Sequence, residues 1–228
     1  MNDLSVQEMN QTVILNKGDV ASKRAEIKTY FNYTWEQYEL LFDVLASDEV
    51  FYERPQPLRH PLLFYVGHTA TFFVNKLVLG KLLSERINPR FESLFAIGVD
   101  EMSWDDLNDA HYEWPQVAEV FAYRDQVKVA VNQVIDEMEI TIPIAWESPA
   151  WTILMGIEHE RIHLETSSVL IRQLDLSLVK SIDAFAPHEA DGREAPQNEL
   201  ISVEGGTVEL GRQTHEIYGW DNECERRS

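Results

Sequence analysis

Hydrophobic residues recur at three- and four-residue spacings in four long segments of the chain, which is the period of an amphipathic helix. The predicted helices cover residues 22–45, 61–83, 115–138 and 148–174. Ser22 and Ser148 are the expected N-caps of the first and fourth helices. The second segment is apolar on most sides and should lie at the centre of a helical assembly. The pattern therefore predicts an all-α protein built as a four-helix bundle.

The period is lost between the second and third helices, over residues 86–115. A short helix capped by Ser103 is expected inside this long loop. Loops of this length in compact domains are more often functional than idle. The alternative is a connector that is packed by its own aromatic side chains.

The chain changes character again after the fourth helix. In residues 199–211, apolar positions flank Gly205 and Gly206, which predicts a short C-terminal β-hairpin with the glycines at the turn. A lone hairpin is only marginally stable, so it should pack on the bundle or belong to a further domain. The expected organisation is as follows: an N-terminal lead at 1–21, the bundle at 22–180, a linker at 181–198 and the start of a second domain at 199–228.

Composition narrows the possible partners and the compartment. The formal net charge of −20 argues against binding to nucleic acid or to an anionic membrane. The most apolar segment contains His68, Lys76 and Lys81, so it is expected to be a buried bundle helix and not a membrane span. The first 20 residues lack the pattern of a signal peptide. Cys224 is the single cysteine, which excludes an intrachain disulfide and favours a cytoplasmic location.

Two histidines in the fourth predicted helix form the clearest chemical feature. His159 and His163 are four residues apart, so both side chains lie on one face of a helix and can reach one metal ion. The alternative is a pair of partly buried, hydrogen-bonded histidines. His68 in the second helix is the best candidate for a third ligand, because adjacent bundle helices approach within about 8 to 10 Å. His60, near the start of the same helix, is its competitor.

Three imidazoles with open coordination positions suit zinc, iron or another divalent transition metal, and their spacing does not choose among them. Metal-bound histidines usually hold a carboxylate or carbonyl at the other ring nitrogen. Glu158, Glu160 and Glu165 are the candidate carboxylates, although Glu165 could equally be a surface residue. His159-Glu160-x-x-His163 also matches the HExxH signature of zinc metalloproteases, in which the glutamate is the general base. Bundle-like apolar flanks, and the lack of a third protease ligand at a familiar distance, argue against that function.

Four stretches of the sequence resemble one enzyme family in content and order. They are RPQPLRHPLLFYVGHTA at 54–70, RINPRFES at 86–93, GVDEMSWDD at 98–106 and MGIEHERIHLETSS at 155–168. Together they resemble the N-terminal part of the 5-histidylcysteine sulfoxide synthases of the ovothiol pathway. The HxxxH spacing alone is similar only to the wider DinB-like superfamily of metal-binding four-helix bundles.

The resemblance implies a mononuclear non-haem iron(II) enzyme. Such an enzyme uses O2 to join the sulfur of cysteine to the imidazole of histidine as a sulfoxide. By position, the resemblance makes His68, His159 and His163 the iron ligands. Tyr65 and Asn75 are candidate contacts of the substrate histidine.

The chain departs from this family at its C-terminal end. There, the family continues into a large formylglycine-generating-enzyme-like domain and usually a methyltransferase domain. In this chain, residues 205–211 and 218–223 resemble only the first strands of the former. We therefore expect this chain to hold the metal ligands but to have little or no synthase activity alone, since the missing domain normally lies in the same chain. The second hypothesis for the function is a zinc-dependent hydrolase or thiol transferase of the DinB-like type. The third is a metal-free helical interaction domain.

Overall fold

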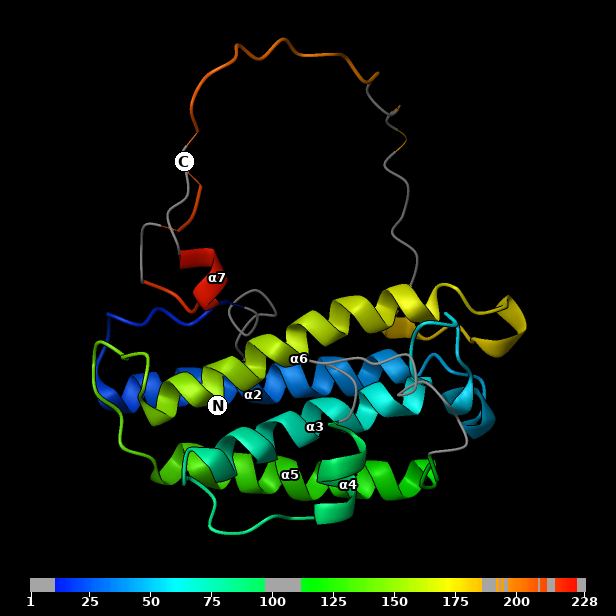
Figure 1. Cartoon of the computed structure of the whole chain (residues 1–228), viewed down its shortest axis with the longest axis horizontal. Coiled ribbons are helices and arrows are strands. Elements are labelled where there is room, and N and C mark those ends of the chain that lie inside the picture. The colour runs from blue at the N-terminus through cyan, green and yellow to red at the C-terminus, as the bar shows by residue number, and fades with distance from the viewer. Residues whose placement is uncertain are drawn as a thin grey trace.

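Four long helices form a bundle in the computed structural model (Figure 1). The structure describes residues 11–96, 112–185, 192, 194, 197–208, 210–212 and 216–224. The bundle helices are α2 (Val20–Phe42), α3 (Leu62–Leu79), α5 (Val117–Glu137) and α6 (Pro149–Ile171). Shorter helical segments are η1 (Asp48–Tyr52), α4 (Pro89–Leu94), η3 (Leu176–Leu178), η4 (Asp183–Phe185) and α7 (Asp221–Cys224). The predicted all-α bundle is confirmed.

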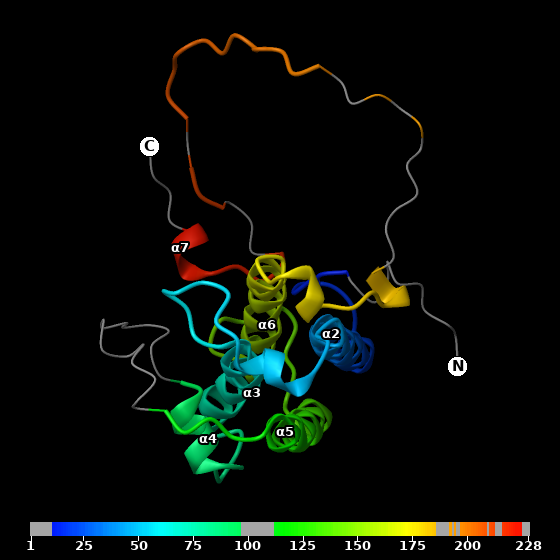
Figure 2. The same ribbon diagram turned by 90° about the vertical axis from the view of Figure 1, so that its right-hand side faces the viewer.

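The helices do not simply alternate in direction. α2 and α6 run one way along the bundle, and α3 and α5 run the other way (Figure 1). The connection between α3 and α5 therefore returns along the bundle, which accounts for the long loop that the sequence places there. Seen along the helix axes, α3 lies between α5 and α6, and α2 packs on α6 (Figure 2).

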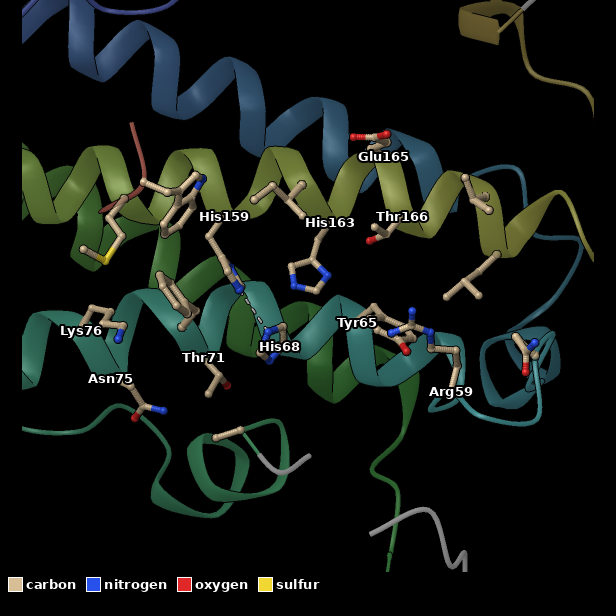
Figure 3. Close-up of a pocket in the computed structure, with 18 of the residues that line it drawn as sticks. Arg59, Tyr65, His68, Thr71, Asn75, Lys76, His159, His163, Glu165 and Thr166 are labelled. Atoms are coloured by element: carbon tan, nitrogen blue, oxygen red, sulfur yellow. Dashed lines mark hydrogen bonds between the residues drawn. The ribbon is translucent and has the colours of Figure 1, made fainter. Parts of the chain in front are cut away.

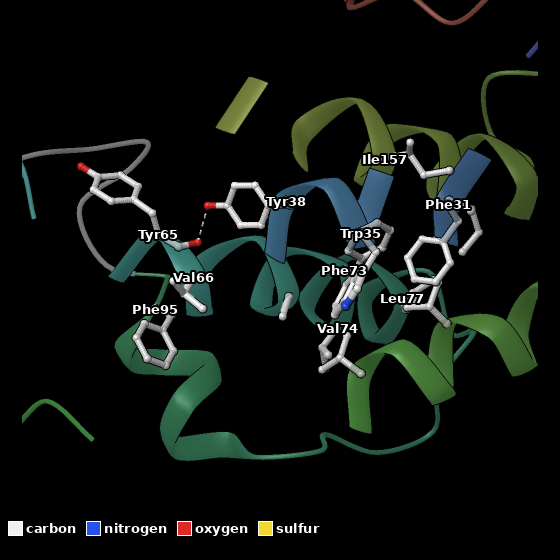
Figure 4. Close-up of a cluster of buried hydrophobic side chains, with 14 of the residues drawn as sticks. Phe31, Trp35, Tyr38, Tyr65, Val66, Phe73, Val74, Leu77, Phe95 and Ile157 are labelled. Carbon is white, nitrogen blue, oxygen red and sulfur yellow. Dashed lines mark hydrogen bonds between the residues drawn. The ribbon is translucent and has the colours of Figure 1, made fainter. Parts of the chain in front are cut away.

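α3 is the central helix of the bundle, as its composition predicts. It is long and apolar enough to cross a membrane by those two criteria, yet 72% of it is buried inside the structure. Its apolar side chains meet those of α2, α5 and α6 in one core, where the rings of Phe31 and Phe73 pack edge to face at 5.4 Å (Figure 4). The packing of the bundle thus explains why α3 is apolar on most sides.

The helix ends follow from local signals that the sequence only partly reveals. Ser148 caps α6 by accepting a hydrogen bond from the backbone N–H of Trp151, as expected. The predicted cap of α2 is wrong: Asp19 is its N-cap, and Ser22 is the third helical residue of a capping box. Asn88 caps α4, a helix that the sequence pattern missed because six residues are too few to show a period. The short helix expected at Ser103 lies outside the described residues.

Residues 13–15 and 217–218, which lie near the two ends of the described chain, meet beside α6. Val13 and Leu15 are each 1% exposed, so these two residues of the N-terminal lead belong to the core. Ile14 forms an antiparallel bridge with Ile217. Tyr218 is buried next to Trp151, with ring centroids 4.8 Å apart. Residues from near both ends therefore close the same side of the bundle.

The predicted C-terminal β-hairpin is wrong. Residues 197–208 form neither helix nor strand. Leu200, Ile201 and Val203 are exposed, and nothing lies within 4 Å of a Cβ placed on Gly205 or Gly206. Alternation of apolar residues favours a strand only where a surface covers them, and the described bundle offers this segment no such surface.

Candidate metal centre

Three histidines from two helices converge on one point. His68 comes from α3, and His159 and His163 come from α6 (Figure 3). One nitrogen from each ring can be chosen so that all three nitrogens lie within 4.8 Å of one another. The Nε2 atoms of His68 and His159 are 3.3 Å apart. The structure thus brings together the three residues that the sequence singled out.

Close contact between α3 and α6 makes this convergence possible. The ring of Phe73 on α3 lies directly against Gly156 on α6, in the space that a Cβ at position 156 would fill. Gly156 is one turn before His159 and faces the same neighbouring helix. A larger residue there would force the two helices apart and separate His68 from the α6 pair.

His68 is oriented by the backbone of α4. Its Nδ1 lies 2.7 Å from the carbonyl oxygen of Phe95, the residue that follows α4. A carbonyl oxygen only accepts hydrogen bonds, so Nδ1 carries the proton and the neutral ring presents a lone pair at Nε2. Gly67 allows this arrangement, because a Cβ at position 67 would lie 2.5 Å from the Phe95 ring. The unpredicted helix α4 therefore supports the site.

His159 is oriented by stacking. The ring of Phe72 lies parallel to it, with a centroid distance of 3.7 Å and an interplanar angle of 8°. Within the described part of the chain, Nδ1 of His159 and Nδ1 of His163 are buried without a hydrogen-bond partner. Phe72 thus holds the ring plane of His159, whereas a hydrogen bond at the other ring nitrogen more commonly orients a metal-binding histidine. No pattern in the sequence indicates this role of Phe72.

Burial keeps these histidines neutral. Burial, with smaller contributions from the neighbouring His68 and Arg59, lowers the pKa of His163 to about 3. Burial lowers the pKa of His159 even more, and the other two imidazoles add to the effect. Metal ions bind the neutral form of imidazole, so the ligands need not lose protons near pH 7.

The donor set fits a divalent transition metal. When two nitrogens bind the same metal ion, each at about 2.0 to 2.1 Å, they lie about 3 Å from each other. The Nε2 atoms of His68 and His159 are 3.3 Å apart, which is close to this separation. Three imidazoles leave coordination positions for other ligands, as in catalytic metal sites. The geometry and the neutral rings favour a metal site over a packed histidine cluster.

The cluster opens into a cavity of about 770 Å³ between α3 and α6 (Figure 3). Tyr65 and Asn75, the candidate substrate contacts, line it. The Tyr65 ring is 6.0 Å from the His163 ring, centroid to centroid. Asn75 accepts a hydrogen bond of 2.7 Å from Arg86 through its side-chain oxygen. Small molecules can therefore approach the three histidines.

His60 is not part of the cluster. It is buried and stacks on Phe64, with ring centroids 4.2 Å apart. Phe64 in turn stacks on His68 at 5.3 Å. The Phe64 ring thus lies between His60 and His68. His60, the competitor for the third ligand position, is therefore kept away from the cluster.

Glu158 and Glu160, two of the predicted carboxylate partners of the histidines, have other partners in the structure. Glu158 accepts a hydrogen bond of 2.8 Å from the hydroxyl of Tyr30 on α2. Glu160 is fully buried and forms an ion pair of 2.9 Å with Arg124 on α5. Positions 158 and 160 lie about 100° to either side of His159 on the helix, so they face other helices. Glu165 is exposed at the cavity, and no hydrogen bond joins it to a described imidazole.

The position of Glu160 also argues against a zinc protease. Its carboxylate accepts hydrogen bonds from Arg124 and from the hydroxyl of Thr69, at 2.9 and 3.2 Å, inside the core. It does not line the cavity. A general base must reach the water or substrate that it deprotonates, and Glu160 is instead held by a buried arginine.

Comparison with known proteins agrees with this architecture. The sequence profile of the DinB superfamily matches residues 30–167, a range that contains all three histidines. The chain belongs to the DinB superfamily. This DinB protein is also similar to Ergothioneine biosynthesis protein 1 of Neurospora crassa, with 26% identity over 206 residues. The match covers 83% of the chain but only 23% of that relative, so the chain spans about a quarter of the length of the curated relative.

Proposed function

We propose that this chain is the iron-binding part of a sulfoxide synthase that joins the sulfur of cysteine to the imidazole of histidine with O2. The observation that carries the proposal is the cluster of His68, His159 and His163, which opens into a cavity large enough for small molecules. Similarity to a protein of ergothioneine biosynthesis supports a role in sulfur and histidine chemistry. The chain's single cysteine favours the reducing cytoplasm as its location.

The proposed reaction balances without a further reductant. The thiol of cysteine and one imidazole C–H of histidine each lose a hydrogen as the carbon–sulfur bond forms, which removes two electrons. Oxidation of the sulfur to the sulfoxide removes two more. O2 accepts all four electrons, so one oxygen atom becomes the sulfoxide oxygen and the other leaves as water. Iron(II) would supply the site at which O2 is activated next to both substrates.

The chain's own residues would position the reactants. The three histidines line the cavity from α3 and α6, and the apolar side chains of Phe72 and Met155 line it beside them. Holding two amino acids in one cavity turns a multi-component encounter into a local reaction. We propose that residues beyond this chain complete the site, as in the resembling family, and that the chain alone has little or no synthase activity.

Ergothioneine biosynthesis is the second candidate, because it is the role named for the curated relative. The same metal site would serve both reactions. The two candidates differ in the histidine that is bound: free histidine for the ovothiol type, and its trimethylammonium betaine for ergothioneine. A direct comparison of these two ligands decides between them.

Binding of the amino acids to the metal-loaded protein tests the proposed function. We expect cysteine to add a thiolate-to-metal charge-transfer band to the absorption spectrum of the cobalt(II)-loaded protein under anaerobic conditions, and histidine to shift the metal's visible bands. Ile162→Ala, which alters the cavity wall without removing a nitrogen ligand, serves as the control. A cobalt spectrum that neither cysteine nor either histidine form changes would contradict the proposal.

A further inference from the structure

Two basic side chains lie at opposite ends of the cavity (Figure 3). Lys76 lies towards the end of α3 and on the side of His159, whereas Arg59 lies just before α3, on the side of Tyr65 and His163. Helical side chains lean towards the N-terminus of their helix. Accordingly, the Lys76 ammonium lies 5.1 Å from the centroid of the Phe72 ring, the ring that stacks on His159.

Neither basic residue forms an ion pair within the described part of the chain. Salt bridges there use Lys23, Lys28, Arg86, Arg90, Arg124 and Lys128. This is notable in a protein with 39 acidic and 19 basic residues. Among the described residues that line the cavity, Glu165 is the one carboxylate, and it is exposed. An acidic protein that leaves two cations in one cavity unpaired provides favourable positions for anionic groups of a ligand.

Both side chains lie close to the histidine cluster. The Phe72 ring beside the Lys76 ammonium stacks on His159 at a centroid distance of 3.7 Å. Arg59 lies beside Tyr65, whose ring is 6.0 Å from the ring of His163 (Figure 3). A carboxylate bound beside either cation would therefore place the rest of a small molecule near the three histidines.

The two cations lie on different sides of the histidine cluster. Lys76 is on the side of His159, and Arg59 is on the side of Tyr65 and His163 (Figure 3). A carboxylate held by one cation therefore leaves the other end of the cavity for a second ligand.

We propose that Lys76 and Arg59 each bind the carboxylate of a separate amino-acid ligand, so that the two ligand side chains approach the histidine cluster from opposite ends. This inference rests on the proposed function, which supplies the two amino acids, and it assigns the residues that orient them. Lys76 acts as a single point charge above Phe72. The planar guanidinium of Arg59 can bind a carboxylate through two parallel hydrogen bonds.

Affinities for ligands with and without a carboxylate test the inference. The protein is loaded with cobalt(II) under anaerobic conditions, and the dissociation constants of L-cysteine, cysteamine, L-histidine and histamine are measured by calorimetry. The same measurements are made on Lys76→Met and Arg59→Gln. Lys180→Met is the control, because Lys180 is exposed and does not line the cavity. Thermal unfolding shows whether each variant is folded.

We expect each substitution to lower the affinity for one of the two amino acids by about 10- to 100-fold, which is the range for a charge-assisted hydrogen bond. Lys76→Met and Arg59→Gln should affect different amino acids. Affinities for cysteamine and histamine should not change. The inference is overturned if folded Lys76→Met and Arg59→Gln bind both amino acids as Lys180→Met does, or if the amines are bound as tightly as the amino acids. If the ligands bind to the metal-loaded protein but those with a carboxylate bind no more tightly than those without one, only this inference is overturned. Failure of every ligand to change the cobalt spectrum would overturn the proposed function as well.

Discussion

The Nε2 atoms of His68 and His159 lie 3.3 Å apart, although the two residues are separated by 91 positions in the sequence. Nδ1 of His68 donates to the carbonyl oxygen of Phe95, so its Nε2 directs a lone pair towards His159. In this buried setting the rings are neutral, and the facing nitrogens need a proton or a metal ion between them. A bound ion would also accept the lone pair of a His163 ring nitrogen, which lies within 4.8 Å of a nitrogen of each of the other two rings. The fold therefore holds the three proposed metal ligands close together.

Gly67→Ala should damage the site without removing a ligand. Its Cβ would lie 2.5 Å from the Phe95 ring, so Phe95 and the carbonyl that orients His68 must move. We expect metal affinity to fall by about 10- to 100-fold, as for loss of a partner that orients a ligand. Equilibrium titration with cobalt(II) measures this change. Gly205→Ala is the matched control, since nothing lies within 4 Å of its added Cβ. Equal affinities in the two variants would disprove the role of Gly67.

Phe72 should contribute to metal affinity because its stacked ring orients the imidazole of His159. Phe72→Leu removes a ring that stacks on His159 at 3.7 Å, while it keeps an apolar side chain in the cavity wall. We expect about a 10-fold loss of metal affinity, in the lower range for residues that orient ligands. Phe72→Tyr should retain the affinity because it retains the stacked ring. If leucine and tyrosine at position 72 give the same affinity, stacking does not orient His159.

Glu160 should be a structural residue. It is fully buried with Arg124, which also pairs with Glu39 at 2.9 Å and packs on Trp35 at 4.0 Å from the ring centroid. Glu160→Ala leaves part of a buried charge uncompensated, and we expect the free energy of unfolding to fall by about 3 to 5 kcal/mol. Urea denaturation measures this loss.

Adding Arg124→Met to Glu160→Ala should restore part of the lost stability, because it removes the uncompensated cation. A loss of less than about 1 kcal/mol in Glu160→Ala would show that the buried pair is not a major source of stability. Proteolytic activity that disappears in a folded Glu160→Gln variant would instead support the zinc protease function.

Much of the fold could be predicted from the sequence because helical periodicity is a local and repeated signal. The i, i+4 spacing of His159 and His163 fixes their common face, and His68 lies in the most apolar helix, which is the helix most certain to have neighbours on several sides. These three residues were therefore accessible to sequence reasoning. α4 was missed because it has six residues, although Asn88 and Pro89 carry the sequence signature of a helix start.

The surroundings of the site could not be predicted in the same way. The partners of Glu158 and Glu160 are Tyr30 on α2 and Arg124 on α5, and these depend on which helix packs against which face of α6. The stacking of Phe72 on His159 likewise depends on the relative position of α3 and α6. The hairpin prediction failed because alternation is only half of what a strand needs. The exposed apolar residues of 200–210 lack the covering surface that would complete it.

Metal binding by single-histidine variants tests the central claim most directly. The protein is loaded with iron(II) under anaerobic conditions and dialysed, and bound metal is measured by elemental analysis beside cobalt(II) titrations. We predict one tightly bound ion per chain, and a loss of affinity of at least about 100-fold in each of His68→Ala, His159→Ala and His163→Ala, since each removes one of three ligands. Ile162→Ala, from the same cavity wall, should bind as the unaltered protein does. Undiminished metal binding by a folded His68→Ala variant would contradict the three-histidine site.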